Sequence, residues 1–214
     1  MISFDRREAL RYMGYHGAEP DAAVAESLER CAAELQTAVQ PKSISARFPL
    51  SFIGENTMQI GDLTVTSANL ARNLRGCTEV YLMAATLGIG ADRLIARASA
   101  VRMSDAVILQ AVAAAMIETC CDEVNDALRH MAEREGLYCR PRFSPGYGDF
   151  SIEHQRDFSR LLDTPRKIGL TVTESCLLAP IKSVTAVIGL SETPQPCHRK
   201  GCEECGKTDC AYRR

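Results

Sequence analysis

Four cysteines crowded into the C-terminal tail are the first chemical feature of this chain. In CHRKGCEECGKTDC, Cys197, Cys202, Cys205 and Cys210 have the spacing C-x4-C-x2-C-x4-C. Thiolates hold Zn²⁺ tetrahedrally and also ligate iron–sulfur clusters, so this density of ligands favours a metal site over a tail of free thiols. The spacing alone leaves zinc and an iron–sulfur cluster equally open, and His198 can replace one ligand.

The other six cysteines have a different setting, since they are scattered through apolar or mixed segments. Such thiols are usually small buried hydrophobes of a reducing compartment. The net charge of -2 gives no general reason to expect a nucleic acid or an acidic membrane as partner. No apolar run approaches the roughly 20 residues of a membrane helix, and the charged N-terminus lacks a signal core. We therefore expect a cytoplasmic protein.

A second chemical feature is RFSPGYGDF, residues 142–150. The guanidinium of Arg142 can bind a carboxylate or phosphate through two parallel hydrogen bonds, and Tyr147 can stack on an aromatic ring or a cation. Proline and glycine together also make a plain turn. The residues alone leave a ligand site and a structural turn about equally open.

Two other patterns are better explained by packing. Gly88 and Gly90 follow an apolar strand as in a dinucleotide fingerprint, but Arg93 stands where the third glycine is needed, so we reject a Rossmann site. Cys120 and Cys121 are adjacent on a predicted helix and point about 100° apart, which favours core packing over chelation of one ion.

Periodicity and turn residues predict an α+β fold with an antiparallel sheet. The predicted helices cover residues 5–14, 21–39, 67–75, 91–100, 104–134 and 151–162, with Ser67, Ser104 and Ser151 as caps. The predicted strands lie within 43–66 (with a turn at 54–56), 79–86, 167–175 and 183–191. We divide the chain into N-terminal helices and a hairpin (1–75), a core (76–193) and a Cys-rich tail (194–214).

Three motifs in order give the chain a resemblance to a known family. They are Arg-x-x-Pro-Gly-Tyr at 142–147, Thr-Glu-Ser at 173–175 and Ser-Val-Thr at 183–185. With the segment MAATLGIGADRLI, they resemble the activation (reactivation) domain of cobalamin-dependent methionine synthase over residues 80–191. The chain is similar to short stand-alone members, and the cysteine tail is absent from the domain fused to the large enzyme.

The resemblance implies an S-adenosylmethionine (AdoMet) site. Arg142 would grip the AdoMet carboxylate, the backbone around Ser144 and Gly146 would contact polar groups of the ligand, and Tyr147 would line the groove. Glu118 on the long helix would face the cationic end of the ligand. A further tyrosine that the family places after its last strand is missing here, where the sequence reads Thr-Pro-Gln-Pro.

The function implied by the resemblance is reactivation of a corrinoid methionine synthase, within the methyltransferase class. Oxidised cob(II)alamin on a partner protein gains one electron, and methyl transfer from AdoMet then traps the reduced cobalt. The implied partners are a corrinoid-binding methionine synthase subunit and an electron donor such as a flavodoxin or ferredoxin. The cysteine tail would relay the electron as an iron–sulfur cluster or, with zinc, dock the partner.

Two other functions remain open. The chain can be a non-catalytic module that senses AdoMet or docks to a corrinoid protein. A self-contained AdoMet methyltransferase is less favoured, because no general base stands out beside a substrate pocket.

Overall fold

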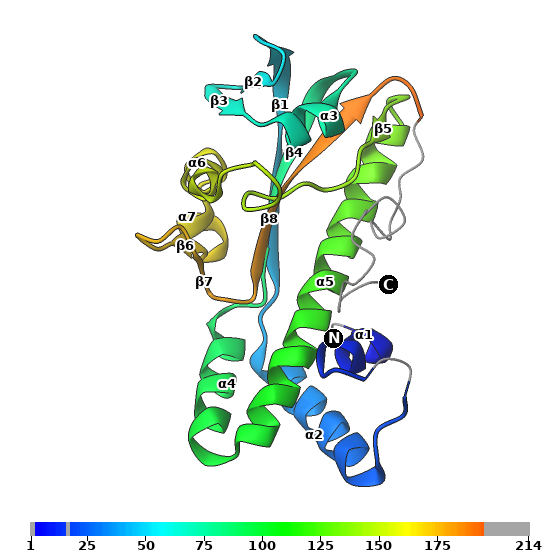
Figure 1. Cartoon of the computed structure of the whole chain (residues 1–214), viewed down its shortest axis with the longest axis vertical. Helices are drawn as coiled ribbons and strands as arrows, with labels where there is room; N and C mark the ends of the chain where they lie inside the picture. Colours follow the sequence, from blue (N-terminus) through cyan, green and yellow to red (C-terminus); the bar gives the residue numbers. More distant parts are fainter. Residues whose placement is uncertain (1–2, 16–17, 195–214) are drawn as a thin grey trace.

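The computed structural model describes residues 3–15 and 18–194, and it confirms the α+β fold with an antiparallel sheet. Helices cover both faces of this sheet (Figure 1). The six strands of the sheet are β1 (Lys42–Phe52), β2 (Thr57–Ile60), β3 (Leu63–Thr66), β4 (Cys77–Thr86), β5 (Tyr138–Cys139) and β8 (Ser183–Ser191). The predicted metal ligands, Cys197, Cys202, Cys205 and Cys210, lie outside the described residues.

The strand order β3-β2-β1-β4-β8-β5 places β4 inside the sheet, between β1 and β8. Ala84 on β4 lies opposite Ile44 on one side and Thr185 on the other. Since side chains alternate between the faces of a strand, an apolar strand with neighbours on both edges serves two cores at once. Tyr81, Met83 and Ala85 enter one core, and Val80, Leu82 and Ala84 enter the other.

The first core lies under four helices that pack on one face of the sheet. These are α1 (Arg6–Tyr12), α2 (Ala22–Ala38), α4 (Ile89–Val101) and α5 (Met103–Glu133). In α2 the side chain of Asp21 accepts a hydrogen bond from the Val24 amide at 2.8 Å, and Leu28, Cys31 and Leu35 are fully buried. Asp21 is therefore the N-cap of this helix, and its buried residues form one apolar stripe.

The second core lies on the opposite face, under shorter elements. They are α3 (Ala68–Leu74), the 3₁₀ turn η1 (Ile152–His154), α6 (Gln155–Leu162) and α7 (Thr164–Ile168). The predicted cap of α3 is confirmed, since the Ser67 hydroxyl accepts a hydrogen bond from the Leu70 amide at 3.0 Å. Ser151 likewise accepts one from the Glu153 amide at 3.3 Å at the start of η1.

The strand predicted within residues 167–175 is confirmed for two residues only. Pro165 lies in the first turn of α7, and the helix ends at Gly169, which has a φ of 70°. Only β6 (Thr171–Val172) remains extended, and it pairs with β7 (Leu178–Ala179) in a separate ribbon. The Leu177 amide donates to the Thr173 hydroxyl at 3.0 Å, which reverses the chain between the two strands.

The predicted cap of the long helix is also wrong, because α5 begins before Ser104. Arg102 alone separates α4 from α5, and its carbonyl accepts the first hydrogen bonds of the new helix. The rest of α5 agrees with the prediction, and Cys120 and Cys121 are both buried. The helix is long and apolar enough to cross a membrane by composition, yet 67% of its most apolar window is buried within the protein, as in a core helix.

The segment that mimics a dinucleotide fingerprint has a packing role instead. Its strand, β4, pairs antiparallel with both neighbours and so forms no parallel βαβ unit. Gly90 lies where α4 meets the end of α2, and a Cβ built on it would come within 1.9 Å of the Ala38 carbonyl oxygen. Gly90 therefore permits a close contact between two helices.

Candidate functional site

An irregularity at the edge of the sheet determines where Arg142 lies. Beyond β5 the Arg140 amide still donates to the Gly189 carbonyl at 2.8 Å, but the next pair is Phe143 with Val187. The edge segment thus contains one residue more than β8 over the same stretch, which is a β-bulge. Pro141 has no amide to offer β8, so this irregularity falls where the sequence cannot continue the ladder.

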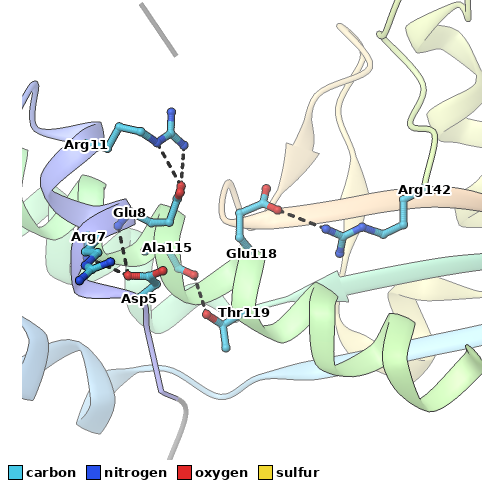
Figure 2. Close-up of polar contacts among 8 residues, drawn as sticks. All are labelled: Asp5, Arg7, Glu8, Arg11, Ala115, Glu118, Thr119 and Arg142. Carbon is cyan, nitrogen blue, oxygen red and sulfur yellow. Dashed lines mark hydrogen bonds and ion pairs between the residues drawn. The ribbon is translucent and has the colours of Figure 1, made fainter. Parts of the chain in front are cut away.

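The side chain of Arg142 reaches from this bulge to two carboxylates on α5. Its Nη2 lies 2.9 Å from an oxygen of Asp122 and 3.4 Å from one of Glu118. Because the two acids are four residues apart on a helix, they share one face. Figure 2 shows Glu118 extended from α5 toward Arg142. The arginine is the least exposed of the three, at 22% of its side chain, compared with 39% for Glu118 and 68% for Asp122.

A tight turn follows Arg142 and exposes Tyr147. Gly146 has a φ of 95°, which favours glycine over any residue with a side chain, and its amide donates to the Phe150 carbonyl at 2.7 Å. The Tyr147 amide donates to the Ser144 carbonyl at 3.2 Å. The amides of Gly146 and Tyr147 and the carbonyls of Ser144 and Phe150 are thus bonded to one another within the turn. The Tyr147 side chain is 68% exposed.

Asp149 fastens the far end of this turn to α3. Its carboxylate accepts hydrogen bonds from the Ser67 hydroxyl, from the amides of Ala68 and Asn69 at 2.7 and 3.1 Å, and from the Asn69 side chain at 3.0 Å. These donors, the Ser67 hydroxyl first, hold the pKa of Asp149 well below its ordinary value. The turn is therefore held at both ends, by the pairing of Phe143 with β8 and by Asp149.

The structure brings the predicted site residues of the core together in part. Arg142 and Glu118 are in contact, and Ser144, Gly146 and Tyr147 form the turn that follows Arg142. Their roles toward a ligand stay predictions. Sequence reasoning missed Asp122, which lies one helical turn after Glu118; the i, i+4 spacing of the two acids was the available signal.

One buried atom of this cluster bears on whether a carboxylate ligand fits. The Nη1 of Arg142 is buried and has no hydrogen-bond partner among residues 3–15 and 18–194. A buried guanidinium nitrogen without a partner is costly, and a carboxylate is its best complement. The residues present therefore fit a ligand that carries a carboxylate.

Metal ligands do not gather in the described part of the chain. Across these residues, no group of three or more histidine, cysteine, aspartate or glutamate side chains is arranged to hold a metal ion. The predicted site in the cysteine tail is outside this range and stays a prediction.

Comparison with solved structures shows which fold this is. The chain is similar to the crystal structure of the MetH reactivation domain bound to AdoHcy, with a TM-score of 0.67 and 16% sequence identity, over 90% of this chain and 75% of that one. No family model matches the sequence, and no curated protein matches it. The fold expected from the motif resemblance is therefore confirmed.

Proposed function

We propose that this chain binds AdoMet, and its demethylated product S-adenosylhomocysteine (AdoHcy), at Arg142 and the turn that follows it. The observation that carries the proposal is the buried Nη1 of Arg142, which has no partner within the described residues. Two facts support it: the two acids beside Arg142, and the shared fold with a reactivation domain whose crystal structure contains AdoHcy.

Each residue of the cluster has a distinct task in this proposal. Arg142 holds the ligand carboxylate through Nη1, while Nη2 stays on the α5 acids. Glu118 and Asp122 attract the cationic amino group of the same ligand. The turn of Ser144 and Gly146 offers carbonyl and hydroxyl groups, and the exposed Tyr147 forms a wall. AdoMet supplies a sulfonium-bound methyl group, which these residues hold at the protein surface where a partner can reach it.

The proposed biological role is reactivation of a corrinoid methionine synthase by reductive methylation of cob(II)alamin held on a partner protein. A flavodoxin or ferredoxin would supply the electron. The tail of four cysteines would carry an iron–sulfur cluster that relays the electron, or a zinc ion that docks the partner. Iron and zinc analysis of protein that is purified and reconstituted without oxygen distinguishes the two kinds of metal site. Absence of iron contradicts the electron relay.

Calorimetric titration with AdoMet and with AdoHcy tests the site. We expect saturable binding of both ligands, because both carry the carboxylate and the amino group, and a loss of about 10–100-fold in affinity in Arg142→Ala. Arg160→Ala is the matched control, since Arg160 pairs with Asp62 on the surface and should leave affinity unchanged. Equal binding by Arg142→Ala, with the protein folded, contradicts the proposed site.

A second assay tests the role. The protein, a reductant, AdoMet and a cob(II)alamin-loaded methionine synthase are mixed, and methylcobalamin is followed by its absorbance. Formation of methylcobalamin that depends on this chain supports reactivation. Ligand binding without methylcobalamin leaves the chain as an AdoMet sensor or a docking module.

A further inference from the structure

A groove runs between α2 and α4 and continues to the start of α5. It consists of two adjoining pockets of about 320 and 330 Å³, which share Glu34, Leu94 and Arg97 in their walls. Ala38 and Ala98 add to its apolar lining. Helices α2 and α4 lie at the end of the molecule opposite β5, so the groove is remote from the bulge that carries Arg142 (Figure 1).

The walls of this groove carry more positive than negative charge. Four arginines line it against two carboxylates: Arg30, Arg93, Arg97 and Arg102 against Glu34 and Asp105. Arg30 lies 3.2 Å from Glu34 and 2.8 Å from Asp105, and the same two acids also lie 4.0 Å from Arg97 and 3.5 Å from Arg102. For Arg93, no carboxylate of the described residues lies within ion-pair distance. The groove thus has two unbalanced positive charges in a chain whose net charge is -2.

Exposed apolar side chains lie at the corner between α4 and α5, and one of them, Val101, lines the groove. Val101, which lines the second pocket, is 82% exposed, and Met103 and Val107 nearby in sequence are 63% and 52% exposed. Large apolar side chains grouped at one corner and bordered by charged residues are typical of protein interaction sites. The arginines on either side match the composition of such sites, where arginine is enriched.

The groove is also preformed. The contact of Gly90 with the Ala38 carbonyl fixes the spacing of α2 and α4 at one end, and the ion pair of Arg30 with Asp105 joins α2 to α5 at the other. When a binding surface is already ordered, less of the binding free energy is lost to ordering its side chains and loops.

We propose that this groove binds an acidic amphipathic helix of a protein partner. The apolar face of the helix would pack on Leu94, Ala98 and Val101, and its carboxylates would pair with Arg93, Arg97 and Arg102. A helix laid into an apolar groove between helices is a common mode of recognition, and complementary charge sets its orientation and its partner. Glu34 and Asp105 on the floor disfavour a nucleic acid, whose phosphates they repel. The inference does not depend on ligand binding at Arg142.

Three fluorescein-labelled helical peptides test it by fluorescence anisotropy. The first has a leucine face and a glutamate face, the second has lysine in place of glutamate, and the third has the composition of the first in an order that destroys the apolar face. We expect saturable binding of the first peptide alone, weakened by added salt because the arginines are exposed.

Variants of the chain locate the binding. Arg93→Glu/Arg97→Glu should weaken binding of the glutamate peptide by about tenfold or more. Val101→Ser, at a position exposed enough to leave folding intact, should weaken it by about fivefold. Arg166→Glu/Lys167→Glu makes the same charge change on α7, on the opposite face of the sheet, and should change it little. No saturable binding of the first peptide, equal binding of the third, or an equal loss in the α7 control overturns the proposal.

Discussion

Replacing Gly90 with alanine tests whether the contact between α2 and α4 outweighs helix propensity. A Cβ at this position comes 1.9 Å from the Ala38 carbonyl oxygen, so the backbone of one helix has to move. Overpacking of this kind costs about 1–3 kcal/mol, whereas alanine in place of glycine inside a helix gains about 1 kcal/mol at most. Because a 1.9 Å approach to a backbone oxygen puts the cost at about 2–3 kcal/mol, we expect a net loss of about 1–2 kcal/mol, which lowers Tm by about 2–8 °C at this chain length.

Thermal and urea unfolding, followed by far-ultraviolet circular dichroism, measures the difference. Gly54→Ala is the matched control, because a Cβ there meets only Thr57 at an ordinary 3.4 Å and no left-handed backbone is involved. The control should stay within about 0.5 kcal/mol of the wild type, and the urea m-value should not change. A Gly90→Ala protein as stable as the wild type refutes the reasoning, because propensity would then outweigh the contact.

Three further outcomes follow from other contacts. The folded-state pKa of Asp149 is lowered, so its ionised carboxylate stabilises the fold above its ordinary pKa near 4, and this stabilisation is lost as pH falls through the folded value. Asp149→Asn should therefore be less stable than the wild type in urea unfolding at pH 7. The difference should become smaller as the pH is lowered. Burial raises the pKa of Cys121 to about 12, so peptide mapping after alkylation at pH 8 should find it modified only in unfolded protein. The Thr185 hydroxyl donates to the buried Gln155 side-chain oxygen at 2.5 Å. Thr185→Val leaves that oxygen without a donor and should lower the free energy of unfolding in urea by about 1–3 kcal/mol. The double variant Thr185→Val/Gln155→Leu, which also removes the oxygen, should recover most of this loss.

The helices could be predicted where the sequence itself contains the caps and stripes. Asp21 and Ser67 are caps whose partners lie within three residues, so local pattern was sufficient. The strand expected within 167–175 is shorter than predicted for a tertiary reason. The alternating apolar and polar residues predict a strand, but Pro165 and Gly169 begin and end a short helix in the same stretch. The residues that remain pair only with the short strand β7, in a ribbon separate from the main sheet.

The site was predictable in its parts and not in its assembly. Arg142 and the Pro-Gly turn were visible because their residue types suit a carboxylate and a close backbone approach. The spacing of Asp122 and Glu118 could place the two acids on one helix face, but the pairing of Asp122 with Arg142 and the attachment of Asp149 to α3 could not be read from the sequence, since each joins residues 20 or more apart. Such contacts depend on how β5 and α3 meet the sheet, which no local pattern contains.

The way the turn is held indicates which of its atoms can respond to a ligand. Phe143 exchanges two hydrogen bonds of 2.9 Å with Val187 on a buried strand, and Asp149 is held by four donors on α3. Between these two anchors the amides of Gly146 and Tyr147 are already bonded inside the turn. A ligand bound at this turn would therefore meet a fixed backbone and the exposed side chain of Tyr147. In the proposed site, Nη2 of Arg142 stays on Glu118 and Asp122 while Nη1 takes the ligand carboxylate, so a ligand would add to these ion pairs and would not replace them.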